Sequence, residues 1–177
     1  WKTVNYPNNS YGSIGAFYQK GNLMLCGLDE SGMFRSTDYG KNWTKTNKGL
    51  DTTKSNTVYI SSIVLKGTLL YAGAGNGYSG GGKLYVSSNE GQNWSAITSP
   101  FNAYPIATLF LNNNMYVSSN GIFSSTDNGG NWKQILPKNI NNSNGFTVGF
   151  YTNGKDIYVP KDNSFQSNDG NIFKTTD

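Results

Sequence analysis

The chain has no histidine, one cysteine and one arginine among its 177 residues. Without histidine there is no Ser–His or Cys–His pair, and a zinc site would lack its usual nitrogen ligand. The lone Cys26 has no partner for an internal disulfide and no histidine to activate it, so we interpret it as a buried structural thiol. No apolar run approaches the length of a membrane-spanning helix, so we expect no membrane insertion.

Charge is also sparse. Lys and Arg total 14 against 10 Asp and Glu, a net charge of +4, and the lysines are scattered rather than clustered. A surface that binds nucleic acid concentrates its basic residues on one stripe or face, so we expect no nucleic-acid partner. We also expect no cofactor and no metal. A calcium site at Asp162 and Asp169 is the weaker alternative, and we interpret that segment as an Asx-rich loop without a metal.

What the chain does contain is a repeat. The pattern Ser/Thr-x-Asp-x-Gly-x-x-Trp occurs at 36–43, 87–94 and 125–132, and a fourth copy breaks off at Asp177. Asn89 replaces Asp in the second copy. The tryptophans at positions 1, 43, 94 and 132 are 42, 51 and 38 residues apart. A period of about 45 residues is typical of the four-stranded blades of a β-propeller.

Short runs of β-branched and aromatic residues fill each period, separated by Gly, Asn and Asp clusters, and no window shows a helical period. Three such runs precede each Asp turn, and a Trp-led strand follows it. We therefore predict an all-β fold, a β-propeller of four-stranded antiparallel blades, with about four blades in a single domain or segment over 1–177. The approximate blades are 5–43, 44–94, 95–132 and 133–177, with 1–4 as an outer strand.

The residue types of the repeated turn suit a hairpin. Asp and Ser side chains bond backbone N–H groups a few residues on, Gly allows a positive φ, and Trp buries a large apolar area. Asn89 keeps an acceptor oxygen but no charge, which argues against an obligatory metal ligand. We interpret the following as structural: Ser36, Asp38, Gly40, Trp43, Asn89, Gly91, Trp94, Asp127, Gly129, Trp132 and Asp177.

These turns resemble the Asp-box, or BNR, repeats of sialidases, the Vps10/sortilin ectodomain, xyloglucanase-type glycoside hydrolases and photosystem assembly factors. The resemblance covers essentially the whole chain and implies Asp-boxes on the hairpin between the two outer strands, away from the ligand-binding face. It implies no single activity. A sialidase needs three Arg to hold the substrate carboxylate; Arg35 is the only one here, and Lys is a poor substitute. We therefore do not expect sialidase activity from this chain.

In a propeller, the loops that join second to third strands and the loops that join successive blades share one rim. An aromatic ring in a Gly-rich loop there, such as Tyr78, has little to pack against and can stack on a sugar or fill a partner's pocket. Phe101 and Tyr104 have the alternative interpretation of rings that cover blade edges. The ligand-binding residues we predict are Tyr78, Phe165, Tyr59, Tyr104, Asp29 and Asp162.

These features favour a binding module, secreted or on the surface of a bacterial cell, that recognises a glycan or protein through the rim, with no catalytic residue assigned. The alternative is a portion of an Asp-box glycoside hydrolase whose paired carboxylates lie partly outside this chain. Both chain ends fall in the same turn of the repeat. Two arrangements stay open: a four-blade ring completed by residues 1–4, or a piece of a larger ring with further blades or an anchoring or sorting domain.

Overall fold

The computed structural model describes residues 5–7, 12–51, 58–75, 81–101, 107–119, 121–137, 146–147, 149–162 and 172–175. These residues form sixteen β-strands and no helix. The strands make four sheets of four strands each, and every strand pair is antiparallel. The prediction of an all-β fold built from four-stranded antiparallel units is confirmed.

Three of the sheets follow the chain in simple order. The first contains β1 (Ile14–Lys20), β2 (Leu23–Leu28), β3 (Gly32–Ser36) and β4 (Thr44–Lys45). The second contains β5 (Tyr59–Lys66), β6 (Leu69–Gly75), β7 (Gly82–Ser87) and β8 (Ser95–Ile97). The third contains β9 (Ala107–Leu111), β10 (Asn114–Ser118), β11 (Gly121–Ser125) and β12 (Lys133–Pro137).

The fourth sheet differs in its pairing. It contains β13 (Phe146–Thr147), β14 (Tyr151–Thr152), β15 (Ile157–Asp162) and β16 (Ile172–Lys174). Both β13 and β14 pair with β15, and β16 pairs with the opposite edge of β15. Within the described residues β16 is therefore the edge of this sheet, in the position that β3, β7 and β11 hold inside theirs.

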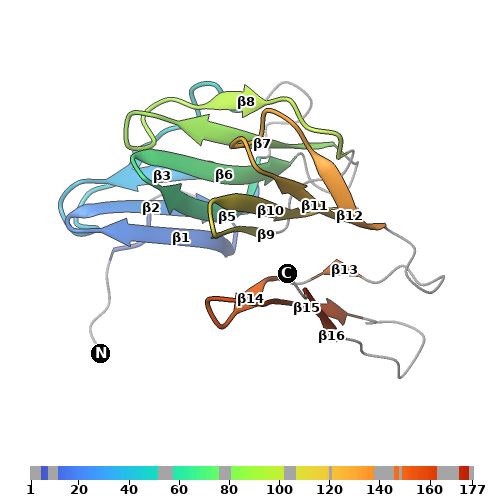
Figure 1. Cartoon of the computed structure of the whole chain (residues 1–177). Helices are drawn as coiled ribbons and strands as arrows, with labels where there is room; N and C mark the ends of the chain where they lie inside the picture. Colours follow the sequence, from blue (N-terminus) through green and yellow to red (C-terminus); the bar gives the residue numbers. More distant parts are fainter. Residues whose placement is uncertain are drawn as a thin grey trace.

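The sheets are arranged as propeller blades. Strand β5 lies between β1 and β9, so the first strands of successive sheets are neighbours and β4, β8 and β12 are outer edges. Figure 1 shows the first sheet (blue) at the left and the fourth (orange to red) below the other three. The four sheets do not close into a ring over the described ranges, so the structure is a partial propeller.

Each of the first three sheets extends past its repeat tryptophan. Thr44 pairs with Arg35, so the first sheet ends at Lys45 rather than at the approximate boundary of Trp43. The second and third sheets likewise end in β8 and β12, beyond Trp94 and Trp132. The predicted outer strand at 1–4 lies outside the described residues.

Hydrophobic clusters fill the spaces between successive sheets, which is why strands such as β2 are apolar on both faces. Ile60 of β5 packs so closely on β2 that a Cβ on Gly27 would lie 2.4 Å from the Ile60 Cβ. Leu25 and Met33 meet Leu70 and Trp94 between the first two sheets. The next two clusters are built on Tyr71, Met115 and Phe123, and on Tyr116, Ile122, Ile157 and Val159.

Candidate functional site

The repeated turn between β3 and β4 is closed by its own side chains. The Ser36 Oγ accepts the Gly40 N–H at 2.9 Å and donates to Asp38 Oδ1 at 2.8 Å. Asp38 Oδ1 also accepts the Asn42 N–H at 2.9 Å, and its Oδ2 accepts Asn42 Nδ2–H at 2.7 Å. These donors, the Asn42 N–H foremost, lower the pKa of Asp38 to about 2. An ionised carboxylate with both oxygens occupied is unsuited to general-acid chemistry at neutral pH.

The second and third turns repeat this geometry. Asp127 Oδ1 accepts the Asn131 N–H at 2.8 Å, and this bond is the first cause that lowers the pKa of Asp127 to about 2. Asn89 Oδ1 accepts the Asn93 N–H and the Ser87 hydroxyl, both at 2.9 Å. The substitution of Asn for Asp therefore preserves the bonds made by one oxygen, which supports a structural role for the turn.

The turns lie at the end of the sheets that carries the β1–β2 hairpin. Asn22, in that hairpin, donates from Nδ2 to the Thr37 carbonyl at 2.8 Å, and its own carbonyl accepts the Tyr39 N–H at 3.3 Å. Because antiparallel strands reverse direction at each turn, the β2–β3 turn at residues 29–31 lies at the opposite end of the sheet. We call this opposite end, with residues 29–31, Asp51, Tyr59 and Lys83, the rim.

The turns also connect neighbouring sheets. The only arginine, Arg35 of β3, donates from Nε to the Glu90 carbonyl at 2.9 Å and forms an ion pair with Glu90 Oε2 at 3.0 Å. Trp132 donates its indole N–H to the Thr98 carbonyl at 3.1 Å, and its ring contacts Phe101 edge-on at a centroid distance of 5.3 Å. Arg35 is thus occupied in holding the second sheet to the first.

At the rim, polar pairs link segments that are far apart in the sequence. Tyr59 at the start of β5 donates its hydroxyl to Glu30 Oε1 at 3.3 Å, which joins the second sheet to the first. Lys83 Nζ lies 3.2 Å from Asp51 Oδ2, and this hydrogen bond and the carboxylate charge raise the pKa of Lys83. The Asp51 N–H donates to the Tyr85 hydroxyl at 3.1 Å, which fixes the segment between the two sheets.

Glu30 has a φ of 68°, a left-handed conformation that is uncommon for a residue other than Gly, Asn or Asp. Its side chain is exposed, whereas Tyr59 is half-buried. The same left-handed backbone occurs at Tyr39, Glu90 and Asn128 in the repeated turns, so at Glu30 it marks a tight turn.

The predicted ligand residues have different outcomes. Tyr59 lies at the rim, and Asp29 precedes Glu30 in the same turn with its N–H bonded to the Ser13 carbonyl at 2.9 Å. Asp162 ends β15, and its side chain is not among those described. Phe101 is buried against Phe123 and Trp132, so it covers the blade edge, the second of its two interpretations. Tyr78, Tyr104, Phe165 and Asp177 lie outside the described residues.

Three rim residues were not among the predicted ligand residues: Glu30, Asp51 and Lys83. Glu30 and Asp51 are acids in loops between predicted strands, so their position was visible in the sequence. The partners were not. Tyr59 is 29 residues from Glu30 and Lys83 is 32 residues from Asp51, and no local spacing rule joins residues at such distances.

The model of the BNR-Asp box repeat matches residues 33–46, which run from β3 through the first turn to β4. The chain therefore carries an Asp-box repeat on a partial β-propeller. In the other two turns the box serine donates to the Asp or Asn oxygen as Ser36 does to Asp38, so this feature of the Asp-box occurs three times in the described residues. A comparison with curated proteins gave no significant match.

Solved structures share the fold at low sequence identity. The GH74 xyloglucanase from Xanthomonas campestris has 16% identity and a TM-score of 0.68, over 89% of this chain and 27% of that one. The extracellular domain of a putative one-component system from B. thetaiotaomicron has 15% identity and a TM-score of 0.68, over 97% and 22%. The computationally designed Ika4 protein has 9% identity and a TM-score of 0.63, over 99% and 98%.

The Asp-box chain thus spans about a quarter of the two natural proteins and nearly all of the designed one. Over the described ranges, no group of three or more His, Cys, Asp or Glu residues is placed to hold a metal ion. In the same ranges no helix has the length and apolar character needed to span a membrane.

Proposed function

We propose that this Asp-box propeller is a secreted or cell-surface binding module that recognises a glycan or a protein through its rim. The observation that carries the proposal is the Tyr59–Glu30 pair, which bridges two sheets at the end opposite the Asp-boxes. A half-buried tyrosine beside an exposed carboxylate offers a ring face for stacking and an acceptor for hydroxyl or amide donors. Tyr59 is the first residue of β5, and Glu30 lies in the short turn between β2 and β3.

The Asp51–Lys83 pair adds a second polar group on the same rim. The Lys83 side chain is 50% exposed and that of Asp51 29% exposed, so both charges are open to a ligand from solvent. An acid and a base held together offer donors and acceptors, as the hydroxyls of a sugar or the backbone of a peptide require. The neighbours named as a xyloglucanase and as an extracellular domain support an extracellular setting and a glycan among the ligands.

The second candidate function is a portion of an Asp-box glycoside hydrolase. The likeness to GH74 structures and the carboxylates of Asp29, Glu30 and Asp51 on one rim favour it. Glycoside hydrolysis needs two carboxylates across the substrate, about 5 to 9.5 Å apart according to mechanism. Further blades of a longer protein would supply the second carboxylate if these residues supply only one.

The binding module is tested first on a glycan array. Titration calorimetry with oligosaccharides of xyloglucan and of microbial polysaccharides then measures the affinity. Glu30→Gln is expected to weaken binding roughly tenfold, because a hydrogen bond to a charged group contributes about 1.5–3 kcal/mol. Glu90→Gln is the matched control: Glu90 is also an exposed glutamate with a positive φ, of 56°, but lies in an Asp-box.

Equal loss of affinity in both variants would show that the rim is not the site. Wild-type protein that binds no glycan would leave a protein ligand, to be found by crosslinking from the rim. Release of reducing sugar that is lost in Asp29→Ala or Asp51→Ala would favour the hydrolase.

A further inference from the structure

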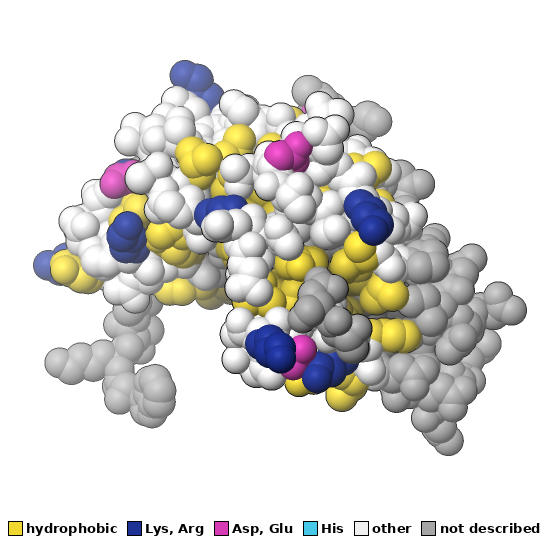
Figure 2. Space-filling model, viewed as in Figure 1, with side chains coloured by type: hydrophobic (Ala, Val, Ile, Leu, Met, Phe, Trp, Pro, Cys, Tyr) yellow, Lys and Arg dark blue, Asp and Glu magenta, His cyan; other side chains and the backbone are white. Residues whose placement is uncertain are grey.

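Asparagine accounts for 25 of the 177 residues. Five asparagines precede a glycine: Asn76, Asn120, Asn128, Asn144 and Asn153. Much of the surface seen in Figure 2 is neither hydrophobic nor charged. An Asn–Gly pair is chemically reactive, because the glycine nitrogen can approach the asparagine side-chain carbon without hindrance from a Cβ. The structure describes both residues of two pairs, Asn128–Gly129 and Asn153–Gly154.

Asn153 lies in the turn between β14 and β15, and its side-chain amide is held through both polar atoms. The Lys155 N–H donates to Asn153 Oδ1 at 3.0 Å, and the Asp156 N–H donates to the same oxygen at 2.8 Å. Asn153 Nδ2 donates to Asp156 Oδ2 at 3.2 Å. Two donors on one carbonyl oxygen stabilise the negative charge that develops there when a nucleophile adds to the carbon. The turn therefore activates the Asn153 amide towards attack.

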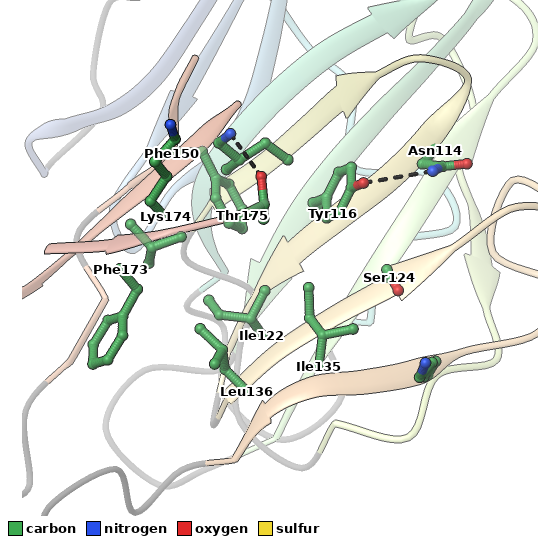
Figure 3. A pocket seen from close by; sticks show the side chains of 13 residues that line it. Asn114, Tyr116, Ile122, Ser124, Ile135, Leu136, Phe150, Phe173, Lys174 and Thr175 are labelled. Atoms are coloured by element: carbon green, nitrogen blue, oxygen red, sulfur yellow. Dashed lines mark hydrogen bonds between the residues drawn. The ribbon is translucent and has the colours of Figure 1, made fainter. Parts of the chain in front are cut away.

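A lysine of the neighbouring strand keeps Asp156 in place as an acceptor. Lys174 of β16 lines the cavity of about 380 Å³ between the third and fourth sheets (Figure 3), and its Nζ lies 3.1 Å from Asp156 Oδ2. This hydrogen bond is the first cause that lowers the pKa of Asp156. The carboxylate therefore stays ionised at neutral pH and fixes the orientation of Asn153 Nδ2.

The attacking nitrogen, that of Gly154, is open to solvent. Apart from its chain neighbours, no atom of the described residues lies within 4 Å of the position that a Cβ on Gly154 would occupy. The Gly154 N–H donates to Thr152 Oγ1 at 3.0 Å, in a bond that is exposed. Hydroxide ions and buffer bases can therefore reach this N–H and remove its proton, as attack on the amide carbon requires.

The same pair of residues is enclosed in the third Asp-box. The Gly129 N–H donates to Ser125 Oγ at 2.8 Å in a buried bond, and a Cβ on Gly129 would lie 2.8 Å from Ile97 Cγ2. Figure 3 shows Ser124 of β11 on the cavity wall, and successive residues of a strand point to opposite faces, so Ser125 points away from the cavity and into the box. Within the described part of the chain, no donor bonds the Asn128 amide oxygen.

We propose that Asn153–Gly154 is a self-modification site, at which the folded chain converts Asn153 to aspartate and isoaspartate, whereas the third Asp-box protects Asn128–Gly129 from this reaction. The Gly154 nitrogen gives its proton to a solvent base and forms a bond to Asn153 Cγ. The bond from Cγ to Nδ2 then breaks, and Nδ2 takes up a proton from water and leaves as ammonia. Water opens the resulting five-membered succinimide at either of its carbonyls, without any oxidation or reduction.

The product changes the turn that makes it. Asn153 Nδ2 is a donor to Asp156 Oδ2, and hydrolysis puts a carboxylate oxygen in its place. A hydrogen bond is thus exchanged for repulsion between two like charges at the end of the fourth sheet. Opening to isoaspartate also inserts the side-chain methylene into the backbone of the β14–β15 turn.

Peptide mapping by mass spectrometry tests the proposal on the 177-residue chain, incubated at pH 9 in water enriched in ¹⁸O. In the folded protein, Asn153 is expected to react roughly tenfold faster than Asn128, and faster than it does itself in urea, because only the fold supplies the two donors to Oδ1. The product should contain ¹⁸O and include isoaspartate. In urea both pairs should react at similar rates. Equal rates in the folded protein, or an Asn153 that reacts more slowly folded than in urea, overturns the proposal.

A substitution at Lys155 tests the activation. Lys155→Pro removes one of the two N–H donors to Asn153 Oδ1, and it is expected to lower the folded-state rate to about that in urea. Lys155→Ala is the matched control, because it keeps the N–H and should leave the rate unchanged. Equal rates in the two variants overturn the proposal. If Lys155→Pro does not fold, the ratio of folded to urea rates in the wild type decides.

A substitution at Ser125 tests the protection. Ser125→Ala releases the Gly129 N–H and is expected to speed the reaction of Asn128 several-fold in the folded protein. Ser87→Ala removes the equivalent bond, from the Gly91 N–H at 2.9 Å, in a box without an Asn–Gly pair. It is the control for general loosening of the fold and should leave Asn128 unreactive. An Asn128 rate that is unchanged in Ser125→Ala, or raised equally by both substitutions, contradicts protection by the box.

Discussion

Two Asp-box tryptophans in equivalent positions differ in the bonding of their indole nitrogens. Trp132 donates to the Thr98 carbonyl, whereas the buried Trp94 Nε1 has no hydrogen-bond partner among the residues that the structure describes. Replacement by Phe removes the N–H from each while leaving an aromatic ring in the cluster. We predict that Trp94→Phe destabilises the protein less than Trp132→Phe does, although Trp94 is the more buried residue.

The magnitude follows from two opposing contributions. Phe lacks three side-chain heavy atoms of Trp, which at about 0.8 kcal/mol per buried methylene, with a small cavity, costs about 2 kcal/mol at Trp94. Removal of the buried, unpaired indole N–H stabilises the fold by about 1–3 kcal/mol. The net change at Trp94 therefore lies between about −1 and +1 kcal/mol. At Trp132 the apolar loss of about 1 kcal/mol adds to about 1 kcal/mol for the lost hydrogen bond, a total of about 2 kcal/mol.

Urea denaturation followed by far-UV circular dichroism measures both variants without relying on tryptophan fluorescence. Unchanged m-values would show that the midpoint shift reports stability rather than a change in compactness. A Trp94→Phe variant that is more destabilised than Trp132→Phe by over about 1 kcal/mol would refute the reasoning, because the lost apolar contacts would then exceed any relief at the donor.

Three further predictions concern titration, reactivity and backbone. The pKa values of Asp38 and Asp127 are lowered to about 2 in the fold, below the ordinary 3.8, so their stabilising effect is complete above that value and disappears as pH falls towards 2. The double variant Asp38→Asn/Asp127→Asn should lose less of its unfolding free energy than the wild type as pH falls towards 2. An equal loss in both proteins would contradict this. Burial raises the pKa of Cys26 to about 11, so Ellman's reagent at pH 8 should label it only after unfolding, and rapid native labelling would contradict the burial. Gly49→Ala should prevent folding, because Gly49 has a φ of 89° and an added Cβ would overlap the Trp94 carbonyl oxygen. Gly67→Ala, with a φ of 61° but open space around it, should cost about 1 kcal/mol by thermal melting.

The repeat made the fold predictable because it encodes contacts that are local in the sequence. Ser36, Asp38 and Asn42 bond one another within six residues, so their spacing is visible in one line of sequence. The strands between the turns then follow from short apolar runs. The sheet-to-sheet contacts are different. Arg35 and Glu90 are 55 residues apart, and their pairing depends on how one blade packs on the next.

The rim was predictable in outline and not in detail. Loop acids and aromatics were expected at one end of the sheets, and Tyr59 and Asp29 lie there. Tyr59 bonds Glu30, 29 residues away, and no pattern of residue types indicates this pairing or the left-handed backbone at Glu30. Phe101 has the second of its two interpretations, because its ring is buried against Phe123 and Trp132 and covers the blade edge.

The second Asp-box explains how far the motif tolerates change. Asn89 lacks the second carboxylate oxygen that Asp38 and Asp127 give to an Asn side chain. This box has other supports: Glu90 pairs with Arg35, and the Gly91 carbonyl accepts the Thr46 hydroxyl. The carboxylate is therefore replaceable where the neighbouring sheet holds the turn from outside. The second box is thus held to the first sheet by Arg35 and Thr46, contacts that do not involve residue 89.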